Sequence, residues 1–200
     1  MEDPNCQQIP SRDEEGKKIR EAFIAEEGNV LVSIDYSQIE MRVQAHLAQC
    51  TSMIQIFNEG RHIHRETCAE IYGIPLLDVD QESPMYKATK NIGFGVMFLE
   101  TEGGLFTQMK REKAEGWDLA RCRQFIKDWY RLRPEVWSWQ QDTIAFARRN
   151  GYVKSMMGRI REIPECLVPV EWIQSAGDRM AVNMPIQGSA QDILKQAMVA

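Results

Sequence analysis

The sequence predicts an α+β fold that is predominantly helical and carries a short antiparallel sheet. Two observations predict this class. Most of the chain shows apolar residues at helical spacing, in stretches bounded by residues that start or stop helices. The segment YVKSMMGRIREIP at 152–164 instead has the pattern of two short strands joined by a turn near Gly158.

A strand and a helix are predicted first. The run VLVSIDY at 30–36 is rich in residues that favour strands, and it places the carboxylate of Asp35 at the end of an apolar strand. A helix should begin at Ser37, because Ser37 and Glu40 match a capping box and apolar residues recur after them at helical spacing. Two short helices are expected next, at 51–58 and 63–72.

A helix is predicted at 84–99, where Ser83-Pro84 is a strong start signal. One face carries a packing stripe of Met85, Ala88, Ile92, Val96 and Leu99. The opposite face presents Tyr86, Lys90, Phe94 and Phe98, with Lys87 close by. Gly93 and Gly95 each cost such a helix about 1 kcal/mol relative to alanine, which predicts a close approach to its backbone. A lysine followed one turn later by a ring suits a phosphate and a stacked base or sugar, although rings packed against a neighbouring element would show the same periodicity.

Helical patterns fill most of the remaining chain. Their predicted ranges are 103–115, 118–131, 134–149 and 170–182. The third ends at Asn150-Gly151, and a break is expected at Pro185, because proline lacks the backbone N–H that continues a helix. A last helix should open near Gln187 and is still in progress at Ala200.

Composition excludes several classes of protein. With 44% hydrophobic and 26% charged residues, the chain has the content of a folded globular domain and not of a disordered or fibrous one. No apolar run approaches the roughly 20 residues that span a bilayer, and the polar first residues do not resemble a signal peptide. The five cysteines are odd in number and form no CxxC pair, which favours reduced thiols in an intracellular protein.

The net charge of −5 hides an uneven distribution. Residues 1–85 carry 7 Lys and Arg against 16 Asp and Glu, whereas residues 86–161 carry 15 against 8. A basic region is expected where a protein faces phosphates, although a solvated helical surface would give the same count.

Several motifs, in order along the chain, resemble those of the DNA polymerase I family, called family A. DYSQIEMR at 35–42 is similar to the family's first catalytic motif, and KATKNIGFGVMF at 87–98 is similar to its fingers-helix motif, at the expected distance. Other family-like segments are DPNCQQIPSR, IREAFIAEEG, GRHIH, NGYV, GRIREIP and NMPIQGSAQDI. The resemblance implies a helical fingers subdomain at 51–150, inserted in an incomplete palm formed by 1–50 and 151–200.

The resemblance implies a catalytic site built on Asp35. In the family this aspartate binds both Mg²⁺ ions, and the backbone carbonyl of the next residue, here Tyr36, binds one. Two-metal transfer of a nucleotide to a primer 3′-hydroxyl needs hard oxygen ligands of this kind. Glu40 matches the family's steric gate, which occupies the space of a ribose 2′-hydroxyl, so the expected substrates are dNTPs.

The resemblance also implies how the nucleotide and the DNA are held. Lys90 would neutralise the triphosphate and, as a catalytic residue, protonate the leaving pyrophosphate. His64 would contact the phosphates, and Phe94 would lie beside the sugar and base, where Phe in place of Tyr predicts poor use of dideoxynucleotides. The other nucleotide-binding positions are Gln38, Ile39, Glu40 and Phe98. The positions implied to touch DNA are Asn5, Arg12, Arg159, Arg161, Asn183 and Gln187.

The sequence departs from the family pattern in three places. Tyr86 stands where the fingers helix usually carries an arginine, and Phe98-Leu99 stands where the family has Tyr-Gly. The second catalytic aspartate, which the family carries in a His-Asp-Glu motif beyond the QGSA segment, does not occur before Ala200. We therefore expect a gene fragment or a split polymerase that is inactive alone and needs a downstream segment or partner chain for that aspartate.

Other functions stay open on the sequence. A non-catalytic nucleic-acid or nucleotide-binding module would keep the basic region without the chemistry, and a helical domain with neither role is a blander alternative. The HIH segment at 62–64, or His64 with Cys68, suggests a zinc site, but no further ligands match. For the family function, the expected partners are a DNA primer–template and dNTPs, with no membrane. The expected location is the cytoplasm of a bacterium or virus-infected host, or an organelle.

Overall fold

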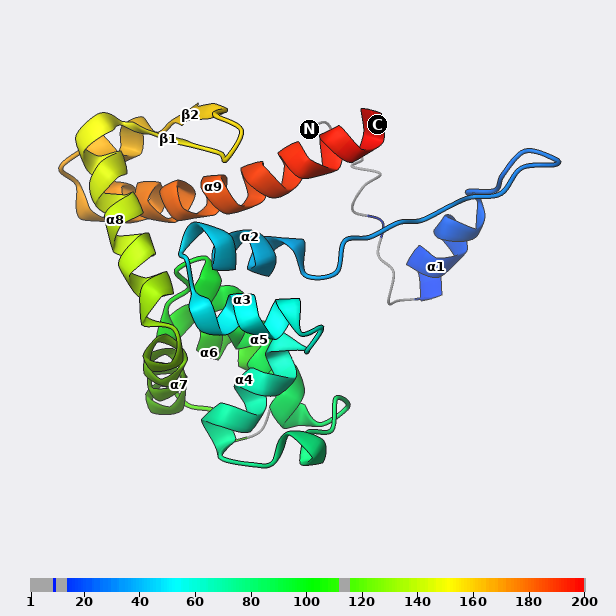
Figure 1. The fold of residues 1–200 in the computed structure, drawn as a ribbon, viewed down its shortest axis with the longest axis horizontal. Helices are drawn as coiled ribbons and strands as arrows, with labels where there is room; N and C mark the ends of the chain where they lie inside the picture. The colour runs from blue at the N-terminus through cyan, green and yellow to red at the C-terminus, as the bar shows by residue number, and fades with distance from the viewer. Residues whose placement is uncertain (1–8, 10–13, 112–115, 200) are drawn as a thin grey trace. The chain divides into compact units, whose positions relative to one another are not determined.

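The chain forms two compact units, Met1–Ser37 and Gln38–Ala200, in a computed structural model that describes residues 9, 14–111 and 116–199. In the first unit, helix α1 (Glu14–Glu21) is followed by chain without regular structure (Figure 1). Among the described residues, none of the helices is both long enough and apolar enough to cross a membrane.

The strand predicted at 30–36 is wrong. These residues have no regular secondary structure, and the side chains of Val30, Val32 and Ile34 are 81%, 74% and 83% exposed. A strand needs a neighbour that pairs with its backbone N–H and C=O groups. Within the described residues the sheet consists of two other strands, so this run has no partner to pair with.

The second unit is mostly helical and contains a short hairpin, which confirms the predicted fold class. Its first helices are α2 (Ile39–Leu47), α3 (Thr51–Asn58), α4 (Ile63–Tyr72), η2 (Leu76–Asp78) and α5 (Pro84–Met97). The later helices are α6 (Glu102–Arg111), α7 (Leu119–Leu132), α8 (Pro134–Asn150), η3 (Pro164–Leu167) and α9 (Glu171–Val199). Strands β1 (Tyr152–Lys154) and β2 (Ile160–Glu162) pair antiparallel between α8 and η3 in the sequence. The turn that joins them contains Gly158 at φ 82°, as the sequence predicts.

Local signals account for several helix boundaries. Ser83 Oγ accepts a hydrogen bond from the Tyr86 backbone N–H at 3.1 Å, and Pro84 opens α5, so this predicted start is confirmed. Asp118 caps α7 in the same way. Gly151 adopts φ 73° and ends α8.

The capping box predicted at Ser37 and Glu40 does not mark the start of the helix. Helix α2 begins at Ile39, and the residue before it, Gln38, has a left-handed backbone with φ 57° and makes no side-chain cap. A capping box needs an extended residue immediately before the helix. Because Gln38 takes that place in a left-handed turn, Ser37 lies outside the first helical turn.

The break predicted at Pro185 is also wrong, because α9 continues through it. Proline inside a helix costs about 3 kcal/mol. The residues around it are buried, including Val182 and Ile186 at 0% exposure, and each such side chain contributes roughly 1.5–3 kcal/mol by burial. Packing of α9 against α2, α8 and η3 therefore outweighs the lost backbone hydrogen bond.

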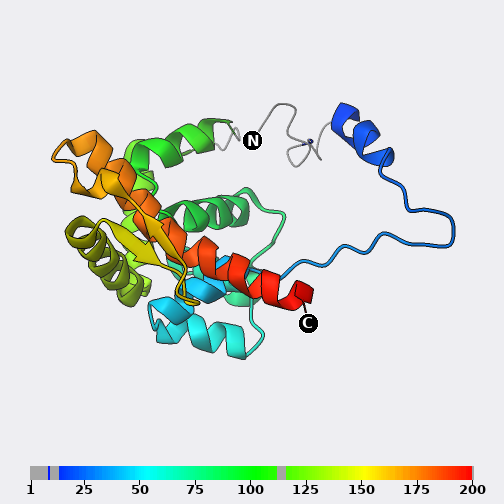
Figure 2. The ribbon, with the colours of Figure 1, turned by 90° about the horizontal axis from the view of Figure 1, so that it is seen from above.

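Within the second unit, α2 lies between the long helix α9 and the group formed by α3 to α7, and α8 crosses one end of α9 (Figure 1). Figure 2 shows the β1–β2 hairpin lying along α9. The main core joins α2, α3 and α5 to α9. A smaller cluster of Ala147, Val153, Ile163 and Cys166 joins α8, the hairpin and η3.

Candidate functional site

Helix α5 exposes part of the face that carries the cation and the rings. Lys90 is exposed and Phe94 is 40% exposed, in agreement with the periodicity. Tyr86 corrects the expected pattern, because it is 7% exposed and packs in a small cluster with Cys68 and Val79. Residues of α4 and the loop after it cover Tyr86, whereas Lys90 and Phe94, further along this face of α5, stay exposed.

The two glycines of α5 lie where other helices approach closely. A Cβ at Gly93 would stand 3.4 Å from Nε1 of Trp129 on α7. A Cβ at Gly95 would stand 2.8 Å from Cδ2 of Leu105 on α6. The predicted close approach is confirmed, and neighbouring side chains account for it.

The C-terminal end of α5 is held by side-chain amides. Gln140 is fully buried and donates to the carbonyls of Val96 and Met97 at 3.3 and 3.1 Å, which satisfies groups that a helix end leaves without partners. Phe98 packs edge-on against Phe94, with ring centroids 5.8 Å apart. Leu99, which follows, has φ 61°, a left-handed conformation that favours glycine.

Two histidines lie near Lys90. His64 is 3% exposed on α4, and burial, together with the nearby charges of His62, Lys90 and Arg133, lowers its pKa to about 4. Burial and the charge of Lys90 also lower the pKa of His62. Both rings are therefore neutral at pH 7. The side-chain amide nitrogen of Gln38 lies 3.2 Å from Nε2 of His62, so the fold brings Gln38, His64 and Lys90 together.

The first turn of α2 carries Ile39 and Glu40, which are both partly buried. Burial raises the pKa of the Glu40 carboxyl. The left-handed backbone of Gln38 directly before this turn is a conformation that clusters at functional sites.

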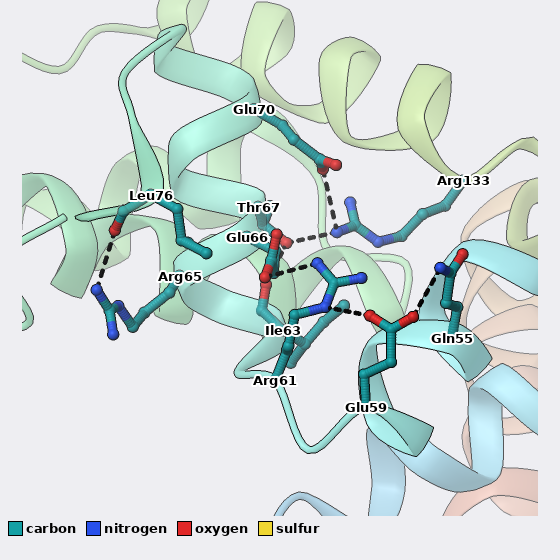
Figure 3. Close-up of polar contacts among 10 residues, drawn as sticks. All are labelled: Gln55, Glu59, Arg61, Ile63, Arg65, Glu66, Thr67, Glu70, Leu76 and Arg133. Atoms are coloured by element: carbon teal, nitrogen blue, oxygen red, sulfur yellow. Dashed lines mark hydrogen bonds and ion pairs between the residues drawn. The ribbon is translucent and has the colours of Figure 1, made fainter. Parts of the chain in front are cut away.

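The segment before His64 is fixed by ion pairs (Figure 3). Arg61 Nη1 lies 2.7 Å from Glu66 Oε1, and Arg61 Nε lies 2.7 Å from Glu59 Oε2. Gln55 in turn donates to Glu59 Oε1 at 2.8 Å. Glu66 is only 9% exposed, whereas 36% of the Arg61 side chain is exposed, so this pair ties the loop to α4 while remaining in contact with solvent.

Sequence reasoning missed Arg133, a charged residue that is only 1% exposed. Its Nη2 donates to Thr67 Oγ1 on α4 (Figure 3). A signal was present in the sequence, because Phe125 and Trp129 form a buried stripe on α7 and Arg133 follows at the same four-residue spacing.

A second set of predicted residues meets in a surface groove of about 400 Å³ beside the hairpin and α9. Its polar lining includes Arg159, Arg161, Asn183 and Gln187. Arg161 is exposed, whereas Arg159 donates to the Gly188 carbonyl at 2.7 Å and pairs with Asp192 Oδ1 at 2.8 Å. These are the four described residues among those predicted to touch DNA. The fold brings them together from two segments that are far apart in the sequence. Side-chain amides of this kind can bond to the minor-groove acceptors that all base pairs share.

Asp35 and Tyr36 lie in the first unit, and both are exposed. A carboxylate and a backbone carbonyl are hard oxygen donors, so the chemistry of this pair fits Mg²⁺. Within residues 14–111 and 116–199, no three His, Cys, Asp or Glu side chains come together as a metal site. His64 and Cys68, the alternative zinc pair, are both buried on α4. Asn5 and Arg12 lie outside the described residues.

Comparisons with known proteins agree over almost the whole chain. Residues 1–200 match the family model described as DNA polymerase family A. The chain is 43% identical to the thermostable DNA polymerase I of Thermus aquaticus and 37% identical to DNA polymerase I of Pseudomonas aeruginosa, over 98% and 99% of its length. It spans only 23% and 21% of those two proteins. Among solved structures, the polymerase domain of Pol1 from M. smegmatis, in complex with DNA primer–template and dNTP, superimposes with a TM-score of 0.84 at 32% identity. That match covers 98% of this chain and 33% of the other.

Proposed function

This chain belongs to DNA polymerase family A, and we propose that it forms the nucleotide-binding fingers and part of the palm of a DNA-directed DNA polymerase. The reaction is attack of a primer 3′-hydroxyl on the α-phosphate of a dNTP, with release of pyrophosphate. The fingers comprise residues 51–150, and the palm comprises 1–50 and 151–200. The protein acts inside the cell, where its DNA substrate lies.

One observation carries the proposal. Lys90 and Phe94 are exposed on one face of α5, and Lys90 lies near His62 and His64. Lys90 supplies positive charge and a proton for a departing pyrophosphate, while neutral His64 supplies a hydrogen bond to a phosphate. Phe94, with Phe98 edge-on behind it, offers an apolar surface to the sugar and base. Gln38, Ile39 and Glu40 complete the site, and the bulk of Glu40 excludes a 2′-hydroxyl.

Catalysis in this proposal uses two Mg²⁺ ions, which would polarise the reacting phosphate and stabilise the attacking and leaving oxygens. Asp35 and the carbonyl of Tyr36 would hold them, together with a second carboxylate from a further segment or a partner chain. The residues of this chain orient the triphosphate and provide the proton at Lys90.

The primer–template would lie against the groove that contains Arg161, Asn183 and Gln187. Exposed Arg161 is suited to a phosphate, while the amides are suited to minor-groove acceptors, so the contact does not depend on sequence. Arg159 supports this surface through its bonds to α9, and Asn5 and Arg12 are proposed as further DNA contacts.

An alternative function is a module that binds nucleotide or DNA without catalysis. The uneven charge distribution of the sequence is as compatible with this module as with a polymerase, since a basic region indicates binding to phosphates and not catalysis. Primer extension distinguishes the two functions, because the module would bind dNTP without extending a primer.

The first experiment measures dNTP affinity with a matched pair of lysine variants. Lys90→Ala should weaken binding of a dNTP to the 200-residue chain by roughly tenfold or more, because a charge that contacts phosphate is lost. Lys87→Ala should change it less than about twofold, because Lys87 is exposed on the same helix and pairs with Glu82 at 2.8 Å. Isothermal titration calorimetry gives both values. Equal effects of the two substitutions would contradict the proposed site.

A further inference from the structure

Arg133 lies at the junction of α7 and α8, where it ends one helix and precedes the other. Its guanidinium is buried and has few partners. Its Nη2 bonds to Thr67 and lies 4.0 Å from the carboxylate oxygen Oε2 of Glu70. Its Nε and Nη1 have no hydrogen-bond partner among the described residues. Burying a cation with so little compensation is costly, so its place in the fold needs a physical explanation.

The first contact of Arg133 reaches the start of α4. Its Nη2 donates to Thr67 Oγ1, and the same hydroxyl donates to the Ile63 carbonyl at 2.7 Å (Figure 3). Ile63 is the first residue of α4 and directly precedes His64. The Thr67 hydroxyl therefore links the guanidinium to the first turn of α4, which carries His64.

The second contact reaches α5. The Arg133 guanidinium carbon lies 4.9 Å from the centroid of the Trp129 ring, which is the distance of a cation–π contact. Trp129 is 1% exposed, and its Nε1 packs beside Gly93 of α5, 3.4 Å from where a Cβ on that glycine would stand. Gly93 stands between Lys90 and Phe94 on the helix, so this contact supports the turn that presents both residues.

We infer that Arg133 is a positioning residue that fixes the first turn of α4 relative to the middle of α5, so that His64 and Lys90 meet one nucleotide triphosphate together. This inference rests on the proposed dNTP site. Neither the family motifs nor the predicted site residues include Arg133, and its action is indirect, through Thr67 and Trp129.

The charge of Arg133 supports the same role. Burial is the largest cause of the lowered pKa of His64, and the charges of His62 from the preceding loop, Lys90 from α5 and Arg133 from the α7–α8 junction lower it further. The ring consequently stays neutral at pH 7, and its hydrogen-bonding pattern does not vary with pH around neutrality.

The test compares three variants of the 200-residue chain. Arg133→Met removes the charge and the donors at similar length, Arg133→Lys keeps the charge, and Arg131→Met removes an exposed arginine two residues earlier as a control. Two quantities are measured. These are the titration midpoint of His64 by NMR, with His46 as the exposed internal reference, and the dissociation constant for a dNTP by calorimetry.

Arg133→Met should raise the His64 midpoint and weaken dNTP binding roughly tenfold, because both the charge and the geometry change. Arg133→Lys should keep the midpoint near the wild-type value while weakening binding less. Arg131→Met should change neither quantity. A wild-type midpoint together with wild-type affinity in Arg133→Met would overturn the inference.

A matched pair at Thr67 covers the case in which Arg133→Met does not fold. Thr67→Val removes the hydroxyl at equal volume, and Thr67→Ser keeps it. The inference requires weaker dNTP binding in the valine variant and recovery in the serine variant, and equal affinities would contradict it. If the wild-type chain binds no dNTP, the proposed function fails, whereas the His64 titration still decides whether Arg133 acts on His64.

Discussion

Glu40 is the residue that we propose excludes a 2′-hydroxyl from the nucleotide site. It is partly buried in the first turn of α2, beside Ile39 and after the strained backbone of Gln38. Burial raises the pKa of its carboxyl. A side chain that discriminates by occupying space, as proposed for Glu40, depends more on its volume than on its charge.

Substitution at Glu40 tests this idea. Glu40→Ala should lower the preference for a deoxynucleotide over the matching ribonucleotide by roughly tenfold or more, because the space for a 2′-hydroxyl opens. Glu40→Gln keeps the volume and should retain most of the preference. The ratio of dissociation constants for ATP and dATP measures the effect, and unchanged selectivity in the alanine variant would contradict the gate.

His64 should make stability depend on pH. Its pKa is about 4 in the folded chain and near 6.5 when unfolded, so the unfolded state binds more protons between these values. The resulting stabilisation is complete above pH 6.5 and is lost as the pH falls through 4, with a total of about 3 kcal/mol. Urea unfolding at several pH values should therefore show a shallower pH dependence for His64→Gln than for wild type. The exposed His46→Gln variant is the control and should retain the wild-type slope.

At the scale of elements, the hairpin and α9 assign different tasks to two arginines of β2 and its turn. Arg161→Ala should weaken binding to a primer–template and reduce the slope of log K against log salt by about one, because one phosphate contact is lost. Arg159→Ala should lower the melting temperature, since Asp192 Oδ1 loses its ion pair and the Gly188 carbonyl loses the hydrogen bond that Arg159 donates. Fluorescence anisotropy across a salt series and thermal unfolding measure the two effects. An unchanged salt slope in Arg161→Ala would contradict a phosphate contact by Arg161.

The contact between α9 and η3 depends on a glycine. A Cβ at Gly177 would stand 2.8 Å from the backbone nitrogen of Cys166 and 3.1 Å from the backbone carbon of Glu165, which only a backbone shift can relieve. Gly177→Ala should therefore lower the free energy of unfolding by about 2 kcal/mol despite its better helix propensity. Gly103→Ala on α6, where the nearest atom lies 3.9 Å away, should be neutral or slightly stabilising. Urea unfolding of both variants checks the difference.

At the scale of the whole molecule, the chemistry needs more carboxylates than the proposed site of this chain supplies. Two-metal nucleotidyl transfer uses at least two acidic ligands, and Asp35 is the one assigned here. We expect the 200-residue chain alone to extend no primer in a template-directed assay while still binding dNTP. Primer extension by the wild-type chain that disappears in Asp35→Ala would show this expectation wrong. If Asp35→Ala binds dNTP as the wild type does, the role of Asp35 lies in catalysis and not in nucleotide binding.

Much of the fold was predictable because helix boundaries follow local chemistry. Ser83-Pro84 opens α5, Asp118 precedes α7, and Gly151 ends α8, each through contacts within a few residues of the chain. The exposure of Lys90 and Phe94 was also predictable from periodicity. Tyr86 was predicted wrongly on the same helix, because its burial depends on α4 and the following loop, which periodicity does not include.

The sequence by itself determined the helical α+β class, most element boundaries and the motifs of family A, because these depend on residue types at short spacings. The tertiary structure decided that 30–36 lacks a strand partner, that α9 runs through Pro185, and that Arg161 meets Asn183 in one groove. It also decided that Arg133 is buried at the α7–α8 junction against α4 and Trp129. The physical reason is that caps and periodicity act within one or two turns of backbone, whereas burial and pairing depend on what distant segments bring to the same place.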